Sequence, residues 1–182
     1  MARGNASDAA VVLDPDAIGE GRDPLGVGIG DAPPGTYALL LQVDPAATVT
    51  VGALGAAEFP AGAYAYVGSA FGSNGLGRVD RHRLVADGTH DVRHWHVDYL
   101  AGHAAASLDA AVAAPRADIE CRLATALRAR TRAPGSDGTA APLPGFGASD
   151  CDCPTHLVAG SDLDALRATV LDAVGTVIPS RD

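Results

Sequence analysis

Residues 36–43 read Thr-Tyr-Ala-Leu-Leu-Leu-Gln-Val and end at an Asp-Pro pair. A short apolar run that stops at turn-forming residues predicts a buried β-strand. Residues 48–51 and 56–60, separated by Gly-Ala-Leu-Gly, predict a hairpin, and residues 63–67 predict a third short strand before a Gly-rich loop. This part of the chain is therefore expected to be rich in strands.

Helical patterns come later in the chain. Arg78, His82 and Val85 recur at helical spacing along one face. Residues 116–132 form a second amphipathic pattern, in which Glu120 shares a face with leucines. A carboxylate on an apolar face is out of place in an ordinary core helix, so we regard Glu120 as a candidate functional residue.

Three further elements complete the predicted fold. A short strand is expected near residues 156–159 and a last helix over about residues 162–174. Residues 93–100 read Arg-His-Trp-His-Val-Asp-Tyr-Leu and alternate strictly between polar and apolar side chains. As a strand, this segment would place three polar side chains on one face: His94, His96 and Asp98.

Length and composition predict one compact domain. The chain has 182 residues, of which 47% are hydrophobic, enough for one sizeable core. Residues 1–33 lack sustained periodicity and are expected to form a flexible acidic extension. Residues 34–160 are expected to form the folded domain, and residues 161–182 a C-terminal helix and tail.

The charge distribution restricts location and partners. The net charge is −9, and all 13 basic residues are arginine, a balance that suits a halophilic cytoplasm with molar salt. Three cysteines without a signal-peptide pattern or a long apolar run argue against a secreted disulfide scaffold and a membrane span, so a cytoplasmic location is expected. Residues 78–132 alone carry net positive charge. They would either meet an anionic polymer or form ion pairs with carboxylates.

Several side chains on the predicted elements suit the hydrolysis of a phosphodiester bond. The reaction needs a divalent ion held by a carboxylate, a cation beside the charge that builds on phosphorus, and an acceptor for the proton of attacking water. Each role has a candidate among five residues: Tyr37, Tyr66, Arg78, His82 and Glu120. The alternative is a tyrosine-bearing core with a surface arginine and glutamate.

Two short motifs, Gly35-Thr-Tyr37 and Tyr66-Val-Gly68, resemble the pair that names the GIY-YIG nuclease superfamily. Further motifs resemble its Uri-type endonuclease-like family, formerly described as a domain of unknown function: Phe59-Pro-Ala-Gly62, Arg78-Val-Asp-Arg-His82, His94-Trp-His-Val-Asp-Tyr-Leu100, Glu120-Cys121 and Gly145-Phe-Gly-Ala-Ser-Asp-Cys-Asp-Cys153. The resemblance runs from about residue 35 to about residue 158. Ordered motifs of this length are far more specific than one Gly-x-Tyr pair.

The resemblance implies a small α/β (α+β) domain with a mainly antiparallel three-stranded central sheet, an extra hairpin and flanking helices. It implies that Tyr37 or Tyr66 acts as general base or orients the attacking water. Arg78 would face the scissile phosphate, and His82 would assist the tyrosine or the leaving group. Glu120 would bind the single divalent metal ion, Mg²⁺ or Mn²⁺.

Departures from the motifs leave one assignment open. From Leu76 to Arg78 the spacing is one residue shorter than the usual leucine-to-arginine spacing of the family. Arg81 is therefore the alternative phosphate-facing residue. Thr36 and Val67 stand where the isoleucines of the motif name occur. These two are expected to be core residues without a chemical role.

Residues near the motifs are expected to line the substrate groove: Gly68, Ser69, Arg81, His94, His96 and Asp98. The alternative for the histidines is a polar sheet face bonded to nearby loops. Thiolates and imidazole also suit Zn²⁺, so Cys151, Cys153 and His156 offer a zinc site. Zinc is the less favoured metal, because Cys-x-Cys-x₂-His departs from the usual spacings. Cys121 and Trp95 are expected to be core residues.

The sequence thus predicts a metal-dependent GIY-YIG-type endonuclease acting on nucleic acid, with DNA favoured over RNA. No separate DNA-binding module is visible, so a partner protein is a candidate for targeting. The competing prediction is a non-catalytic nucleic-acid-binding or structural module of the same fold, with the Cys and His residues holding zinc. The acidic surface favours the competitor, since phosphate contacts weaken with salt, whereas the full Tyr, Arg, His and Glu set favours the nuclease.

Overall fold

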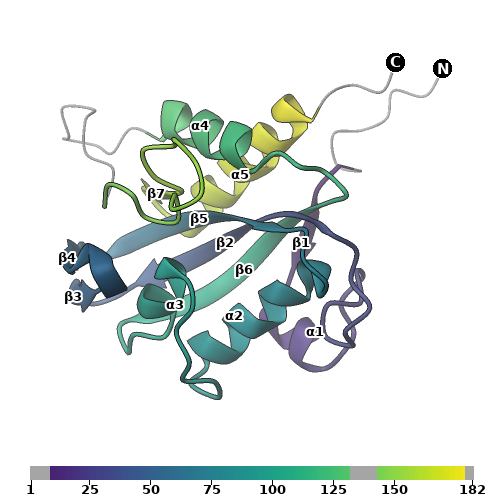
Figure 1. Ribbon diagram of the computed structural model, residues 1–182, viewed down its shortest axis with the longest axis horizontal. Helices are drawn as coiled ribbons and strands as arrows, with labels where there is room; N and C mark the ends of the chain where they lie inside the picture. The colour runs from purple at the N-terminus through teal and green to yellow at the C-terminus, as the bar shows by residue number, and fades with distance from the viewer. Residues whose placement is uncertain (1–8, 132–142, 179–182) are drawn as a thin grey trace.

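The computed structural model describes residues 9–131 and 143–178, which form a five-stranded antiparallel sheet and the helices around it (Figure 1). The strand order is β1-β6-β2-β5-β7. The strands have these bounds: β1 (Val11–Leu13), β2 (Gly35–Val43), β5 (Gly62–Ala70), β6 (Ala106–Pro115) and β7 (Leu157–Gly160). A two-stranded sheet is formed by the hairpin of β3 (Ala47–Thr50) and β4 (Ala56–Phe59).

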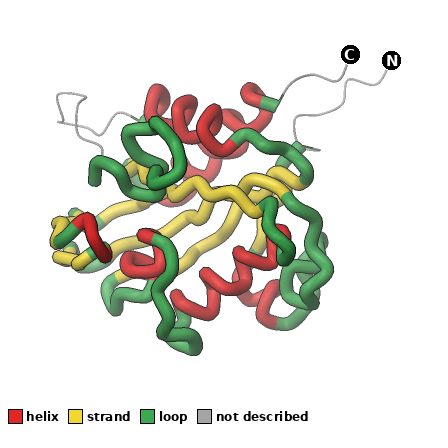
Figure 2. The backbone as a smooth tube through the Cα atoms, viewed as in Figure 1, coloured by secondary structure: helices red, strands yellow, loops and turns green. Residues whose placement is uncertain are grey.

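Helices cover both faces of the central sheet (Figures 1 and 2). One face packs against α4 (Glu120–Arg130) and α5 (Leu163–Val177). The other carries α1 (Pro15–Gly19), α2 (Arg78–Ala86) and α3 (His96–Ala101). The predicted α+β class and mainly antiparallel sheet are therefore confirmed. None of these described helices is long and apolar enough to cross a membrane.

Strand β2 is apolar along its length because both of its faces are covered. It pairs with β5 on one side and β6 on the other. Tyr37, Leu39 and Leu41 belong to the core beneath α2 and α3, whereas Ala38 and Leu40 pack toward α4 and α5. All five are at most 1% exposed. The pleat therefore points the tyrosine of the first motif at α2.

Strands β1 and β6 go beyond the predicted three-stranded sheet. The prediction of a flexible extension is wrong for residues 9–33, since β1 pairs with β6 and α1 follows it with Asp14 as N-cap. Residues 1–8 lie outside the described residues. Half of the residues in strand β6 are alanine, so the strand lacks a clear alternating pattern, and its position is fixed by pairing with β1 and β2.

The predicted strand over residues 93–100 is wrong, and so is the shared face of His94, His96 and Asp98. The chain instead enters α3, where the Asp98 carboxylate accepts the backbone N–H groups of His94 and Trp95. Such bonds satisfy donors at the start of a helix and favour it over a strand. The buried apolar residues of α3 follow helical spacing, which the alternation conceals: Val97, Leu100 and Ala101.

Candidate functional site

Two tyrosines lie side by side on the central strands. Tyr37 of β2 and Tyr66 of β5 have ring centroids 6.4 Å apart, and both are buried. The Tyr37 ring passes over Gly68, its partner in β5; a Cβ atom at Gly68 would come within 2.4 Å of the Tyr37 Cζ and hydroxyl. The motif glycine is therefore needed for Tyr37 to lie in this orientation.

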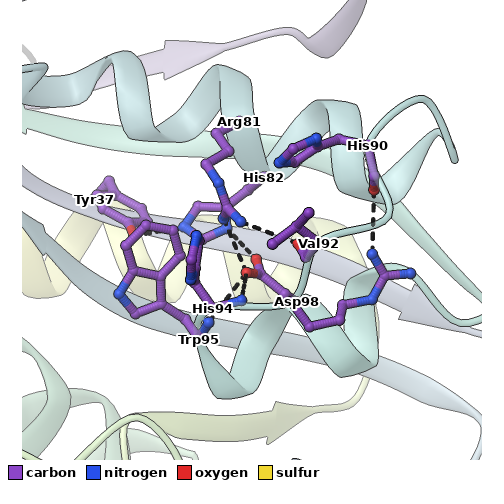
Figure 3. Close-up of polar contacts among 9 residues, drawn as sticks. Tyr37, Arg81, His82, His90, Val92, His94, Trp95 and Asp98 are labelled. Atoms are coloured by element: carbon purple, nitrogen blue, oxygen red, sulfur yellow. Dashed lines mark hydrogen bonds and ion pairs between the residues drawn. The ribbon is translucent and has the colours of Figure 1, made fainter.

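A hydrogen-bonded chain leads from Tyr37 into the helical layer (Figure 3). The Tyr37 hydroxyl lies 2.8 Å from His82 Nε2 on α2, and His82 Nδ1 lies 2.8 Å from Asp98 Oδ1 on α3. A carboxylate accepts, so His82 donates through Nδ1–H and its Nε2 accepts the Tyr37 hydroxyl proton. The order of donors resembles that of a nucleophile, base and orienting acid.

Asp98 is the centre of this network. Its Oδ2 accepts from Arg81 Nη1 at 2.9 Å and from the backbone N–H groups of His94 and Trp95 at 2.9 and 3.1 Å. Burial acts to raise the pKa of Asp98, but the bonds from His82, Arg81 and the backbone outweigh it and hold the pKa well below its usual range. Asp98 is therefore a carboxylate at neutral pH.

His82 is held neutral. Burial lowers its pKa, and the nearby arginines add to this effect, while Asp98 opposes it. A neutral imidazole with Nδ1–H directed at Asp98 keeps the lone pair of Nε2 directed at Tyr37. The pair is thus arranged to accept a proton from the phenol.

Two arginines of α2 pack against one indole. Guanidinium carbons of Arg78 and Arg81 lie 4.6 and 4.5 Å from the ring centroid of Trp95. Arg81 is paired with Asp98 and also donates to the Val92 carbonyl. Arg78 donates to the Ser69 carbonyl and has no ion-pair partner among the described residues. Of the two, Arg78 therefore keeps an unneutralised charge within residues 9–131 and 143–178.

Burial also determines the state of the tyrosines. It is the largest of the effects that raise the pKa of Tyr37 and Tyr66 well above the usual value; Glu120 adds to it and Arg78 opposes it. Both phenols therefore stay protonated at neutral pH. The charges of Glu120 and Arg78 therefore act in opposite directions on the protonation of both phenols.

Glu120 is positioned through Thr36, which precedes Tyr37 in β2. The buried Thr36 hydroxyl donates to the Ala117 carbonyl at 2.8 Å and accepts the Ile119 N–H at 3.1 Å. These bonds fix the turn before α4, so the helix begins at Glu120. Thr36 was expected to be a core residue without a chemical role, but its hydroxyl connects the first motif to the start of α4.

Three cysteines and a histidine form a second cluster. Cys121 follows Glu120 on α4, Cys151 and Cys153 lie in the loop before β7, and His156 directly precedes that strand. One ligand atom of each lies within 4.8 Å of all the others, and the thiols are free. Three sulfur atoms and one imidazole are a set that suits a soft or borderline metal ion. This Cys₃His cluster can therefore hold a metal.

His156 faces both the cysteines and Glu120. Its Nε2 lies 3.3 Å from Cys151 Sγ, and its Nδ1 lies 3.4 Å from Glu120 Oε1. That second contact is an ion-pair distance without hydrogen-bond geometry, and the buried Nδ1 has no other partner among the described residues. The backbone of His156 is fixed by bonds to Phe146 and Val67. The ring thus links the cluster to Glu120.

Residues 36–178 match the family described as domain of unknown function DUF123. This chain is a member of the DUF123 family. No curated protein and no solved structure matches the chain. The DUF123 region begins in β2, after β1 and α1, and contains both the hydrogen-bonded network and the Cys₃His cluster.

Within the DUF123 fold, the predicted catalytic residues are contributed by four elements of the chain. Tyr37 and Tyr66 come from the sheet, Arg78 and His82 from α2, and Glu120 from α4. The predicted zinc ligands Cys151, Cys153 and His156 also meet, and Cys121 joins them as a fourth. Cys121 is partly exposed, so its expected place in the core is wrong.

The residues expected to line a groove have different environments. Gly68 and Asp98 are buried, so neither residue is exposed to line a groove. His94 is exposed, and Ser69 presents its carbonyl to Arg78. His96 accepts the Gly147 N–H through Nδ1 at 2.9 Å and so supports the loop before β7.

Proposed function

We propose that this DUF123 protein is a metal-dependent endonuclease of the GIY-YIG, Uri-like type that hydrolyses phosphodiester bonds of nucleic acid. The observation that carries the proposal is the chain from Tyr37 through His82 to Asp98, with the charges of Arg78 and Glu120 acting on the phenol. A core tyrosine does not need a neutral histidine oriented by a buried carboxylate. General acid–base chemistry does.

The network supplies what a buried phenol lacks as a base. When the Tyr37 oxygen accepts a proton from the attacking water, its own proton passes to His82 Nε2, 2.8 Å away. The imidazolium that forms lies beside the Asp98 carboxylate, which stabilises it. The water oxygen bonds to phosphorus as the bond from phosphorus to the leaving oxygen breaks. Tyr37 relays the proton without becoming a phenolate.

Arg78 is the arginine we propose for the phosphate. Arg81 is committed to Asp98, and a guanidinium already paired with a carboxylate is a weaker partner for a second anion. Arg78 bonds to a carbonyl group, which leaves its charge available. An arginine contact to phosphate carries no base information, so the cleavage position would be set by nucleic-acid shape or by a targeting partner protein. We favour DNA over RNA as the substrate.

Glu120 is the residue we propose for Mg²⁺ or Mn²⁺. Its side chain is 27% exposed, and no hydrogen bond within the described residues engages Oε2. A single carboxylate with room for water and substrate oxygens fits Mg²⁺, which commonly keeps several waters in such sites. When bound there, the ion would supply charge neutralisation at the phosphate and activation of water.

The competing function is a non-catalytic module of the same fold, and the burial of the phenols favours it. Tyr37 and Tyr66 are 1% and 4% exposed, so a substrate has little direct access to their rings. In that case the network would serve stability, and Arg78 would contribute to binding alone. Cleavage and binding measured on the same variants separate the two functions.

The test is cleavage of labelled single-stranded, duplex and branched DNA and RNA with Mg²⁺ or Mn²⁺ across a salt series. We expect wild type to cut, and Glu120→Gln and Arg78→Ala to lose about 10²-fold or more of the rate. Glu58→Gln and Arg167→Ala remove charges on β4 and α5, outside the proposed site, and should cut like wild type. A wild type that binds but never cuts, or Glu120→Gln cutting at the full rate, would reject the nuclease.

A further inference from the structure

The four ligand atoms of the Cys₃His cluster are already close to the spacing of a tetrahedral zinc site. Zinc bonds of about 2.3 Å to sulfur and about 2.0–2.1 Å to nitrogen separate tetrahedral ligands by about 3.5–3.8 Å. Cys151 Sγ and His156 Nε2 are 3.3 Å apart, and no two of the four atoms are more than 4.8 Å apart. A metal therefore needs only small movements of side chains to be enclosed.

The two nitrogens of His156 point to different partners. Nε2 lies on the cysteine side and Nδ1 on the side of Glu120. A metal-bound histidine commonly donates its other N–H to a carboxylate, which fixes the ring and the carboxylate together. The buried Nδ1, which lacks a hydrogen bond in the described residues, then becomes an N–H with an acceptor 3.4 Å away.

We propose that Cys121, Cys151, Cys153 and His156 form a structural zinc site whose histidine holds the Glu120 carboxylate in position. Four protein ligands leave no open coordination position, so the ion has a structural role. Zinc binding itself does not depend on the proposed nuclease function. The importance of orienting Glu120 does rest on it.

The site would also fix the loop that covers Tyr66. Phe146 packs on Tyr66 with ring centroids 6.0 Å apart, and Gly147 lies so close that a Cβ atom there would come within 2.6 Å of the Tyr66 ring. This loop bonds to the residues next to the ligands, with Gly145 N–H donating to Pro154 and His156 N–H donating to Phe146. One ion therefore joins the start of α4 to the covering loop.

The first experiment measures zinc per chain in full-length protein purified under reducing conditions and titrated with a competing chelator. We expect about one zinc in wild type. Cys121→Ser and Cys153→Ser should lower zinc affinity by at least about tenfold. Asp152→Asn changes an exposed residue between two ligands and should keep the ion. Absence of zinc after loading, or equal affinity in the serine variants, would overturn the site.

A second measurement needs no variant of a ligand and no activity. In the Co²⁺-substituted wild type, three thiolates and a tetrahedral geometry should give strong sulfur-to-metal absorption and intense d–d bands. Weak octahedral bands would reject the site. This readout stays decisive even where a serine variant fails to fold.

The link to Glu120 is tested by NMR of the His156 ring in the zinc-loaded protein. We expect an Nδ1–H signal that Glu120→Gln shifts while zinc stays at one per chain. A signal that does not move would reject the link. His156→Cys keeps four ligands and removes the imidazole, so zinc should be retained while cleavage falls about 10–100-fold. If wild type does not cut, the NMR result still decides the link, and the nuclease proposal alone fails.

Discussion

Two polar clusters lie near the tyrosine pair, and they differ in how many of their polar atoms have hydrogen-bond partners. In the network of Tyr37, His82 and Asp98, every side-chain nitrogen and oxygen has a hydrogen-bond partner. In the Cys₃His cluster, the three cysteines form no disulfide among the described residues, and the buried His156 Nδ1 has no hydrogen bond there. The first cluster is complete as a protein structure, whereas the second has the composition of a metal site.

Breaking the complete network should produce the largest effect. Asp98→Asn replaces a buried carboxylate that accepts four hydrogen bonds, and we expect the free energy of unfolding to fall by about 3–5 kcal/mol. Denaturant unfolding measures it. Asp80→Asn, which removes a partly exposed ion pair with Arg83, should cost less than about 1 kcal/mol. An equal loss in both variants would contradict a special role of Asp98.

The orientation of Tyr37 within the network depends on Gly68. Gly68→Ala puts a methyl group 2.4 Å from the phenol, and the overpacking should cost about 3 kcal/mol of the free energy of unfolding. Gly72→Ala is the matched control, because the nearest atom to its Cβ is 3.9 Å away. Thermal unfolding of the two variants compares them. If Gly68→Ala left the free energy of unfolding unchanged, the Tyr37 ring would be able to move aside without cost, and the need for glycine would be contradicted.

Thr36 connects the two clusters, since it precedes Tyr37 and bonds to the turn before Glu120 and Cys121. Thr36→Val keeps the shape and leaves a buried C=O and N–H unpaired, which should cost about 2 kcal/mol. Thr48→Val, at an exposed position, should be nearly neutral. Chemical denaturation measures the free-energy change. If zinc affinity fell in Thr36→Val but not in Thr48→Val, the Thr36 hydroxyl would be shown to position Cys121 at the start of α4.

The smallest expected effect is a pH dependence of the free energy of unfolding. It sharpens the comparison because it comes from His82, in the fully hydrogen-bonded network. The folded protein holds the pKa of His82 below its unfolded value of about 6.5, so the unfolded chain binds the proton more readily. Stability should therefore fall as pH is lowered through 6.5, by at most about 1.4 kcal/mol per pH unit. His82→Gln should reduce this slope, leaving the smaller part due to His96, whose pKa burial also lowers, while His103→Gln should keep the full slope. Unfolding curves from pH 5 to 8 test this; identical slopes in all three proteins would contradict it.

The sequence alone was enough to predict the elements with clear periodicity. Strands β2 and β5 and helix α2 lie at predicted positions, so Tyr37, Tyr66 and His82 could be assigned to facing elements. The alternation of residues 93–100 misled, because bonds between the Asp98 side chain and the nearby backbone decided for a helix. An Asp three residues after Trp95 was the available signal for that helix start.

Contacts between distant segments were the part that local patterns could not give. Cys121 lies 30 positions before Cys151, and nothing around it in the sequence distinguishes a metal ligand from a small core residue. Strand β6 is similarly defined by its two neighbours and not by its own alanine-rich pattern. Thr36 was misjudged because a threonine in place of an isoleucine suggests a packing role. The partners of its hydroxyl are 81 and 83 residues away, so no local pattern indicates them.

Trp95 is the single tryptophan of the chain, and it contacts two guanidinium groups and the edge of the His82 ring at a centroid distance of 5.4 Å. Fluorescence excited selectively in the indole band therefore originates beside this network. A polyanion that draws Arg78 away from the indole will change the emission, and so will the protonation of His82. The molecule thus carries a built-in optical reporter of its candidate site, readable without a label.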